Sequence, residues 1–88
     1  MKITFDPKKA ASNFRKHGVR FSDAESVFFD PMALTREDED AEGEQRFVSI
    51  GTDATGTVLV VVFTHRGAEI RLISARRASA RERAYYEG

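Results

Sequence analysis

The sequence lacks cysteine, so neither a disulfide bond nor a thiolate metal site can form. It also lacks an apolar run of the ~20 residues that a membrane-spanning helix needs, because the longest run, Val58–Phe63, has six. No apolar stretch of roughly 7–15 residues follows the first residues, as a signal peptide would require. We therefore expect a cytoplasmic protein with no membrane segment. The 88 residues allow one modest core, which predicts a single domain over residues 1–88.

A net charge of zero hides an uneven distribution of charged side chains. Residues 36–45 hold six carboxylates and one arginine, whereas residues 65–86 hold six arginines and two glutamates. A localised basic segment favours an anionic partner, with RNA and DNA as the obvious candidates. The alternative is a solvent-exposed helix face on which arginines and glutamates pair.

The N-terminal third carries the signals of one strand and two helices. Residues 2–5 predict a short strand. Asp6 can cap a first helix, a proline follows at the first helical position, and Gly18 suits the left-handed conformation at its end. Ser22 and Glu25 have the spacing of a capping box, which predicts a second helix. The second proline of the chain should end that helix.

The rest of the chain changes to the period of β-strands and returns to a helix only at its end. The run from Thr57 to Thr64 is too uniformly apolar for an edge strand, so we expect it at the centre of the sheet. A turn at residues 65–67 leads into the last strand, and Ser79 with Glu82 forms a capping box for a final helix. The expected strands are residues 33–36, 46–51, 57–64 and 69–74. The order β-α-α-β-β-β-β-α predicts an α+β fold, an antiparallel sheet with helices packed on it.

Metal-binding patterns are incomplete in this sequence. Residues 38–43 follow the opening of an EF-hand calcium loop, but the twelfth position is Ser49, where a bidentate glutamate is required. His17 and His65 lie far apart, and neither belongs to a ligand pattern typical of metal sites. No glycine-rich phosphate loop follows a strand. We therefore expect no metal ion and no cofactor.

Histidine, lysine, arginine and tyrosine, used without a metal ion, suit the cleavage of RNA. The reaction needs a base for the 2′-hydroxyl, an acid for the departing 5′-oxygen and cations for the charge that builds on the phosphate. Arg46 and Arg71 fall within expected strands and Arg76–Arg77 follow the last one, so the backbone can aim these guanidinium groups. The competing interpretation is an ordinary cross-strand ion pair with Glu44 or Glu69.

His17 and the two C-terminal tyrosines each allow a structural and a functional interpretation. His17 lies in the last turn of the first predicted helix, where the carbonyl end of the helix dipole stabilises an imidazolium without any catalytic role. An imidazole can also transfer protons near neutral pH, and the neighbouring Arg15 and Lys16 would favour its uncharged form. Tyr85 and Tyr86 can stack on nucleobases or protonate a leaving group, but they can equally pack on the sheet.

Taken together, these residues resemble the BrnT family over nearly the whole chain. In the N-terminal half the resemblance rests on Phe5–Lys9, Asn13, Lys16–Val19, Phe21, Ala24, Val27–Phe28 and Asp30–Pro31. In the C-terminal half it rests on Arg46, Gly51, Val58–Thr64, Arg71, Ile73–Arg76, Ala78, Glu82–Arg83 and Tyr86. Family members often carry tryptophan at the position of Phe5, where the phenylalanine ring can still fill a core site.

The resemblance implies a toxin of a bacterial type II toxin–antitoxin pair with a RelE-like ribonuclease fold. Such a toxin degrades RNA and blocks translation until an antitoxin of the BrnA kind covers it. The antitoxin is of the ribbon-helix-helix type, and the joint complex binds operator DNA through it and represses its own operon.

The site residues are predicted from chemistry and not from the resemblance. We predict that His17, Arg46, Arg71 and Arg76 are catalytic, with the arginines as phosphate and transition-state cations. His17 is the first candidate for proton transfer and Lys16 the second. The predicted RNA contacts are Lys16, Arg77, Arg81 and Tyr86. The alternative function is a non-catalytic module that binds a protein or a nucleic acid.

Overall fold

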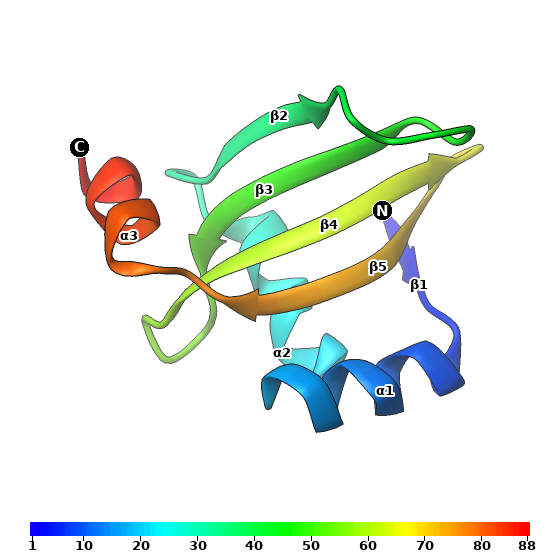
Figure 1. The fold of residues 1–88 in the computed structure, drawn as a ribbon, viewed down its shortest axis with the longest axis horizontal. Coiled ribbons are helices and arrows are strands. Elements are labelled where there is room, and N and C mark those ends of the chain that lie inside the picture. The colour runs from blue at the N-terminus through cyan, green and yellow to red at the C-terminus, as the bar shows by residue number, and fades with distance from the viewer.

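A computed structural model describes all residues, 1–88, and contains one sheet and three α-helices (Figure 1). In chain order the elements are β1 (Lys2–Thr4), α1 (Pro7–His17), α2 (Phe21–Ala24), the 3₁₀ helix η1 (Glu25–Phe29), β2 (Leu34–Asp38), β3 (Arg46–Thr52), β4 (Val58–Arg66), β5 (Glu69–Arg77) and α3 (Ala80–Glu87). The predicted α+β class and order of elements are confirmed. None of the helices is long and apolar enough to cross a membrane.

The five strands lie in the order β1-β5-β4-β3-β2. Strands β2 to β5 form an antiparallel meander, with the apolar strand β4 at the centre, as predicted. β1 departs from the expected antiparallel sheet because it pairs parallel to β5, with Lys2 opposite Glu69 and Thr4 opposite Arg71. The parallel pairing is possible because nearly the whole chain separates the two strands, so no tight hairpin links them.

β1 pairs with only the first residues of β5, and the rest of this edge of β5 is covered by α1 and not by another strand. α1 lies along this edge (Figure 1), and the side chain of Asn13 is buried against it. The Asn13 amide accepts a hydrogen bond from the Ala75 N–H (3.0 Å) and donates one to the Ala75 carbonyl (2.8 Å). It donates a second to the Val19 carbonyl (3.0 Å). Asn13 therefore pairs with the backbone of β5 as a neighbouring strand would.

The signals at both ends of α1 act as predicted. The Asp6 carboxylate accepts a hydrogen bond from the Lys8 N–H at 2.9 Å, and Gly18 adopts the left-handed conformation with φ of 70°. The predicted capping box of Ser22 is wrong, because the N-cap position is Arg20, two residues earlier, and α2 begins at Phe21 without a side-chain cap. Phe21 is buried and packs edge-on against another core phenylalanine, so burial of this ring sets the start of the helix.

The predicted turn between β4 and β5 is displaced. The two strands remain paired as far as Arg66 opposite Glu69, so the hairpin is a two-residue turn in which Gly67 has φ of 61°. β5 also extends to Arg77, which places Arg76 and Arg77 within the strand and not after its end. A longer strand is favoured here because each added residue pairs with the apolar central strand β4.

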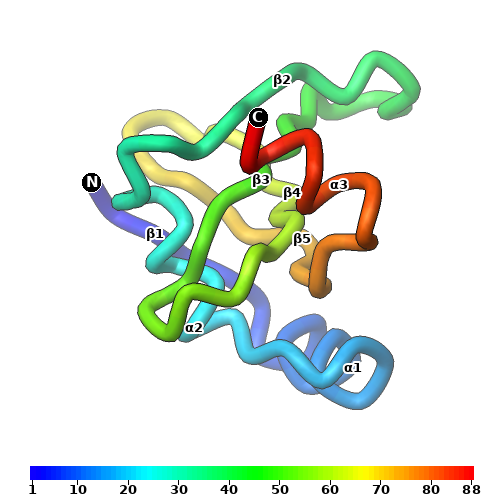
Figure 2. The backbone as a smooth tube through the Cα atoms, turned by 90° about the vertical axis from the view of Figure 1, so that its left-hand side faces the viewer, coloured from blue at the N-terminus to red at the C-terminus, as the bar shows by residue number.

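The sheet separates two clusters of apolar side chains. Figure 2 shows α2 and α3 on opposite sides of the sheet. The larger cluster lies between the sheet and the first helices and contains Val19, Phe21, Ala24, Val27, Leu59, Val61, Phe63, Ile70, Leu72 and Ala75. The smaller cluster lies on the α3 side and contains Val48, Val58, Val60 and Ala78. α3 itself has no buried residue, so the sheet face on its side is only partly covered.

Candidate active site

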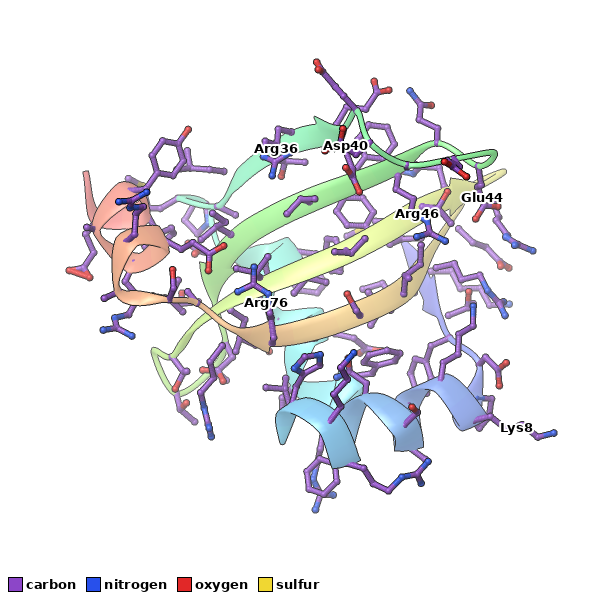
Figure 3. The ribbon with its side chains drawn as sticks, viewed as in Figure 1. Lys8, Arg36, Asp40, Glu44, Arg46 and Arg76 are labelled. Atoms are coloured by element: carbon purple, nitrogen blue, oxygen red, sulfur yellow. The ribbon has the colours of Figure 1, made fainter.

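The partly covered side of the sheet carries four arginines, which we call the arginine face: Arg36, Arg46, Arg71 and Arg76. Directly paired residues in a sheet project to the same side, and the pairing places all four opposite the side that packs on α2. Arg36 lies opposite Val48 and Arg76 opposite Val60, both of the smaller apolar cluster. In Figure 3, Arg36, Arg46 and Arg76 lie over the side of the sheet that is turned to the viewer.

Arg46 and Arg71 lie on either side of the buried Thr64. Arg71 of β5 is paired with Thr64 of β4. On the other side of β4, Phe47 is paired with Phe63, and the next residue of each strand along this register brings Arg46 beside Thr64. Two strand spacings, about 10 Å, therefore separate the backbones of the two arginines. The Thr64 hydroxyl donates a hydrogen bond to the Gln45 carbonyl at 2.6 Å, which ties this row together. Two arginine side chains at this spacing can converge on one phosphate.

Three carboxylates lie close to Arg46 or Arg71, and two of them are paired elsewhere. Glu44 forms an ion pair with Arg66 at 3.2 Å, and Glu69 forms one with Lys2 at 3.3 Å. The third, Asp38, lies directly opposite Arg46 in the β2–β3 pairing and projects to the same side of the sheet. Neither Arg46 nor Arg71 forms an ion pair. The Nε atom of Arg46 is buried and lacks a hydrogen-bond partner. A buried, unpaired donor is costly, but because the Nε atom is enclosed by the chain, an acceptor from outside can reach this guanidinium group only at its Nη atoms.

A β-bulge brings the arginines of β5 to one face. Ile73 is an extra residue between the two pairs that flank it. In a regular strand, Arg71 and Arg76 are an odd number of residues apart and would project to opposite sides. The extra residue reverses the alternation, so Arg76 joins Arg71 on the arginine face.

Arg76 is held by Glu82 of α3. Its Nη1 and Nη2 atoms donate to the two carboxylate oxygens of Glu82 at 2.7 and 2.9 Å. Glu82 also accepts from the Ser79 N–H at 2.8 Å in the predicted capping box, which is confirmed. These hydrogen bonds lower the pKa of Glu82 to about 2, and the bond from Arg76 has the largest effect. The hydrogen bond to Glu82 in turn raises the pKa of Arg76. The charge of Arg76 is therefore balanced by an ion pair within the chain, whereas Arg46 and Arg71 form no ion pair.

His17 lies beside the edge of β5 and not on the arginine face. It follows Asn13 by four residues and so projects from the same side of α1, towards the end of β5 that carries Arg76 and Arg77. Its side chain is half-buried, whereas Lys16 is exposed. No hydrogen bond or ion pair links His17 to the arginines.

The remaining predicted RNA contacts are distributed over both sides of the sheet. Arg77 lines a pocket of about 210 Å³ on the side opposite the arginine face, together with Asp23 and Asp53. Arg81 lies on α3 and lines a groove next to the arginine face. Tyr86 packs against the smaller apolar cluster, and its hydroxyl donates a hydrogen bond to Asp30. The structure thus brings Arg81, but not Arg77, close to the arginine face.

Asp30 fastens α3 to the sheet, a role that sequence reasoning missed. Its Oδ2 atom accepts from the Tyr86 hydroxyl, from the Thr52 N–H at 2.9 Å and from the Thr52 hydroxyl at 3.1 Å. Hydrogen bonds, chiefly that from Tyr86 and then that from the Thr52 N–H, lower the pKa of Asp30 to about 2. No sequence pattern links these three residues, because they come from three separate elements.

The two carboxylates that hold α3 make stability depend on acid pH. Both Asp30 and Glu82 have a pKa of about 2, below their ordinary values of 3.8 and 4.5. A lowered pKa contributes stability above the ordinary value, and this contribution is lost as the pH falls towards the lowered value. We expect the free energy of unfolding to decrease between about pH 4.5 and 2, by on the order of 1 kcal/mol for each group.

Urea unfolding at several pH values, followed by circular dichroism, measures this dependence. Asp30→Asn and Glu82→Gln should each flatten the pH dependence in this range. Asp6→Asn is a suitable control, because Asp6 caps a different helix, α1. Variants at positions 30 and 82 with the same pH dependence as the parent protein would contradict the assignment.

No group of three or more histidine, aspartate or glutamate side chains is arranged to hold a metal ion. The acidic residues 38–43 lie at the end of β2 and in the loop that follows it. Figure 3 shows Asp40 and Glu44 near this loop, at one edge of the sheet.

Comparison with known proteins gives two matches. The family model described as the ribonuclease toxin BrnT of a type II toxin–antitoxin system matches residues 5–82. The chain is also similar to the crystal structure, at 1.1 Å resolution, of the Brucella abortus ribonuclease toxin BrnT. The TM-score is 0.72 at 29% sequence identity, over 90% of this chain and 97% of that chain. A comparison with curated proteins finds no significant match.

Proposed function

Since the chain belongs to the BrnT family of ribonuclease toxins of type II toxin–antitoxin systems, we propose that it cleaves RNA on the arginine face without a metal ion. The family membership inferred from the sequence is confirmed. The observation that carries the proposal is the pair Arg46 and Arg71, which flank Thr64 and form no ion pair, although Asp38 lies opposite Arg46. Two guanidinium groups that form no ion pair within the chain are suited to bind a phosphate.

In the proposed reaction the 2′-oxygen of the RNA attacks the adjacent phosphorus. A bond forms between the 2′-oxygen and phosphorus while the bond from phosphorus to the 5′-oxygen breaks. One proton leaves the 2′-hydroxyl for a base, and another reaches the 5′-oxygen from an acid. Arg46 and Arg71 stabilise the charge on the non-bridging oxygens, and Arg76 contributes when the phosphate competes with Glu82 for its guanidinium group.

His17 is proposed as the proton-transfer residue, with Lys16 as the second candidate. The position of His17 beside the Arg76 end of β5 supports this role, because an RNA strand that ran along β5 past Arg76 would come to that edge. If His17 acts only at the helix end, its replacement will change stability and leave RNA cleavage nearly intact.

We also propose the wider biology that the family implies. Cleavage of RNA inhibits translation, and a BrnA-like antitoxin of the ribbon-helix-helix type neutralises the toxin. The complex of the two proteins binds operator DNA through the antitoxin and represses its own expression. An antitoxin partner and an RNA target are implied by membership of a type II toxin family.

The proposed reaction is tested by the products of RNA cleavage in EDTA. The purified protein, freed from any co-expressed antitoxin by denaturation and refolding, should cleave RNA to fragments with 2′,3′-cyclic phosphate and 5′-hydroxyl ends. A single 2′-deoxy nucleotide at the cleaved position should abolish cleavage there, because it removes the attacking oxygen. Fragments that require added Mg²⁺ would contradict the metal-free reaction. Intact RNA from folded protein, with and without ribosomes, would favour a binding module instead.

A further inference from the structure

The two neighbouring tyrosines of α3 differ in their availability for a ligand. The hydroxyl of Tyr86 is bonded to Asp30, and its ring packs against the smaller apolar cluster. Tyr85, in contrast, is 67% exposed, and its side chain makes no hydrogen bond within the chain. An exposed aromatic ring on an otherwise anchored helix is a rigid platform at low cost in conformational entropy. Tyr85, and not Tyr86, is therefore the tyrosine that can stack on a nucleobase.

Tyr85 lies at a groove between α3 and the strands β2 and β3. The groove has a volume of about 320 Å³, at the low end of the range for small-molecule sites. Its residues are Leu34, Thr35, Arg36, Val48, Ile50, Arg81, Glu82 and Tyr85. The apolar side chains from β2 and β3 face the sheet side of α3, so the groove offers an apolar floor and an aromatic wall.

The charges around the groove favour a nucleotide. Arg36 and Arg81 both line it, and neither forms an ion pair. Glu82 is the one acidic residue of the groove, and both of its carboxylate oxygens are bonded to Arg76. Arg81 and Tyr85 are four residues apart on α3, so they share one side of the helix. A base in the groove would therefore have cations beside it for the adjoining phosphate.

The groove is continuous with the arginine face. Along β2 and β3, the row that contains Arg36 and Val48 is followed by the row that contains Asp38 and Arg46. Two residues along a strand span about 7 Å, which is the separation of the two rows. A single RNA strand that places a phosphate between Arg46 and Arg71 can thus extend its neighbouring nucleotide towards the groove.

We propose that the groove between α3 and β2–β3 is a subsite for one unpaired RNA base, which stacks on Tyr85 while Arg36 and Arg81 bind its phosphate. The inference rests on the proposed ribonuclease function and adds the substrate class, single-stranded RNA, and the residue that engages a base next to the cleaved bond. Stacking on an aromatic ring is the usual way in which proteins hold unpaired bases, and it tolerates any base.

The test measures binding of a short single-stranded RNA that carries a 2′-deoxy nucleotide at the cleaved position. Tyr85→Ala should raise the Kd about 5- to 100-fold, the loss typical of one stacked base, whereas Tyr85→Phe should keep most of the affinity. The salt dependence of binding should stay unchanged in Tyr85→Ala, because no phosphate contact is lost. Phe29→Ala is the matched control, since Phe29 is also an exposed aromatic residue (71%) but does not line the groove.

A series of RNAs with one abasic nucleotide each locates the base. In the parent protein, one abasic position next to the cleaved bond should weaken binding more than the others. That penalty should disappear in Tyr85→Ala, because the partner of the missing base is gone. The thermal midpoint of Tyr85→Ala should equal that of the parent, which separates a binding defect from a folding defect.

Three outcomes would overturn the subsite. They are a Kd of Tyr85→Ala within twofold of the parent, an abasic penalty that persists in this variant, and a loss of antitoxin binding with RNA binding intact. The last outcome would assign the groove to the antitoxin. If the parent protein cleaves RNA while any of these holds, only the subsite fails. If the parent neither binds nor cleaves RNA, the proposed function fails with it.

Discussion

Arg71→Ala is expected to lower the rate of RNA cleavage by about 10²- to 10³-fold, the usual cost of removing one donor that stabilises transition-state charge. Arg71 lies in β5, where it is paired with Thr64 of β4 and forms no ion pair. Arg46 lies two strands away, in β3. The guanidinium group of Arg71 is therefore positioned by the sheet and is not neutralised within the chain. The measurement is the cleavage rate of a labelled RNA under single-turnover conditions in EDTA.

Two further variants distinguish the effect of the planar guanidinium group, which can donate two hydrogen bonds to one phosphate, from the effect of its charge. Arg71→Lys keeps the charge but loses the two-point contact with phosphate, so an intermediate loss of rate is expected. Arg15→Ala removes one exposed arginine from α1 and should leave the rate nearly unchanged. A rate for Arg71→Ala within a few fold of the rate for Arg15→Ala would show that Arg71 acts through general charge alone and would contradict its proposed catalytic role.

Asn13→Ala is expected to cause the largest loss of stability, about 2–4 kcal/mol, or a fall in Tm of about 10–20 °C. The Asn13 amide makes three hydrogen bonds, two to the backbone of Ala75 and one to the Val19 carbonyl. Its removal leaves the N–H and carbonyl of a fully buried β5 residue without partners. Unpaired buried backbone groups are costly because they lose water without gaining another partner.

The stability of the variants is measured by thermal unfolding with circular dichroism. Ser12→Ala, a change at the exposed neighbouring position of α1, should alter stability by no more than about 0.5 kcal/mol. Asn13→Asp is the sharper comparison, since a carboxylate can accept from the Ala75 N–H but cannot donate to the two carbonyls. An Asp variant as stable as the parent would contradict the described hydrogen bonds.

Local signals in the sequence were sufficient to predict the order of the helices and strands and the family. The Asp6 cap, the left-handed Gly18 and the capping box of Ser79 with Glu82 were all predictable, because each depends on residues a few positions apart. The central place of β4 followed from its uninterrupted apolar run. The start of α2 was not predictable in this way, because burial of Phe21 outweighed the local capping pattern of Ser22.

The candidate site depends on partners that are distant in sequence. Arg46, Arg71 and Arg76 were each identifiable as phosphate cations, but their availability was not. Glu44 and Glu69 form ion pairs with other residues, and neither Arg46 nor Arg71 forms one, although Asp38 lies opposite Arg46. Glu82, in contrast, forms an ion pair with Arg76. Cross-strand register and the docking of α3 set these pairings, and neither follows from the spacing of the residues.

Patterns in the sequence were enough to predict the α+β class, the order of the elements, the helix caps at Asp6 and Ser79 and the BrnT family. The folded structure was needed to show that a bulge at Ile73 brings the β5 arginines to one face. It was also needed to show that Tyr86 is bonded to Asp30 while Tyr85 faces a groove. The two kinds of feature differ in the distance along the chain over which they act. Helix caps and hydrophobic periodicity depend on neighbouring residues, whereas register, burial and ion pairing depend on which distant segments the folded chain brings together.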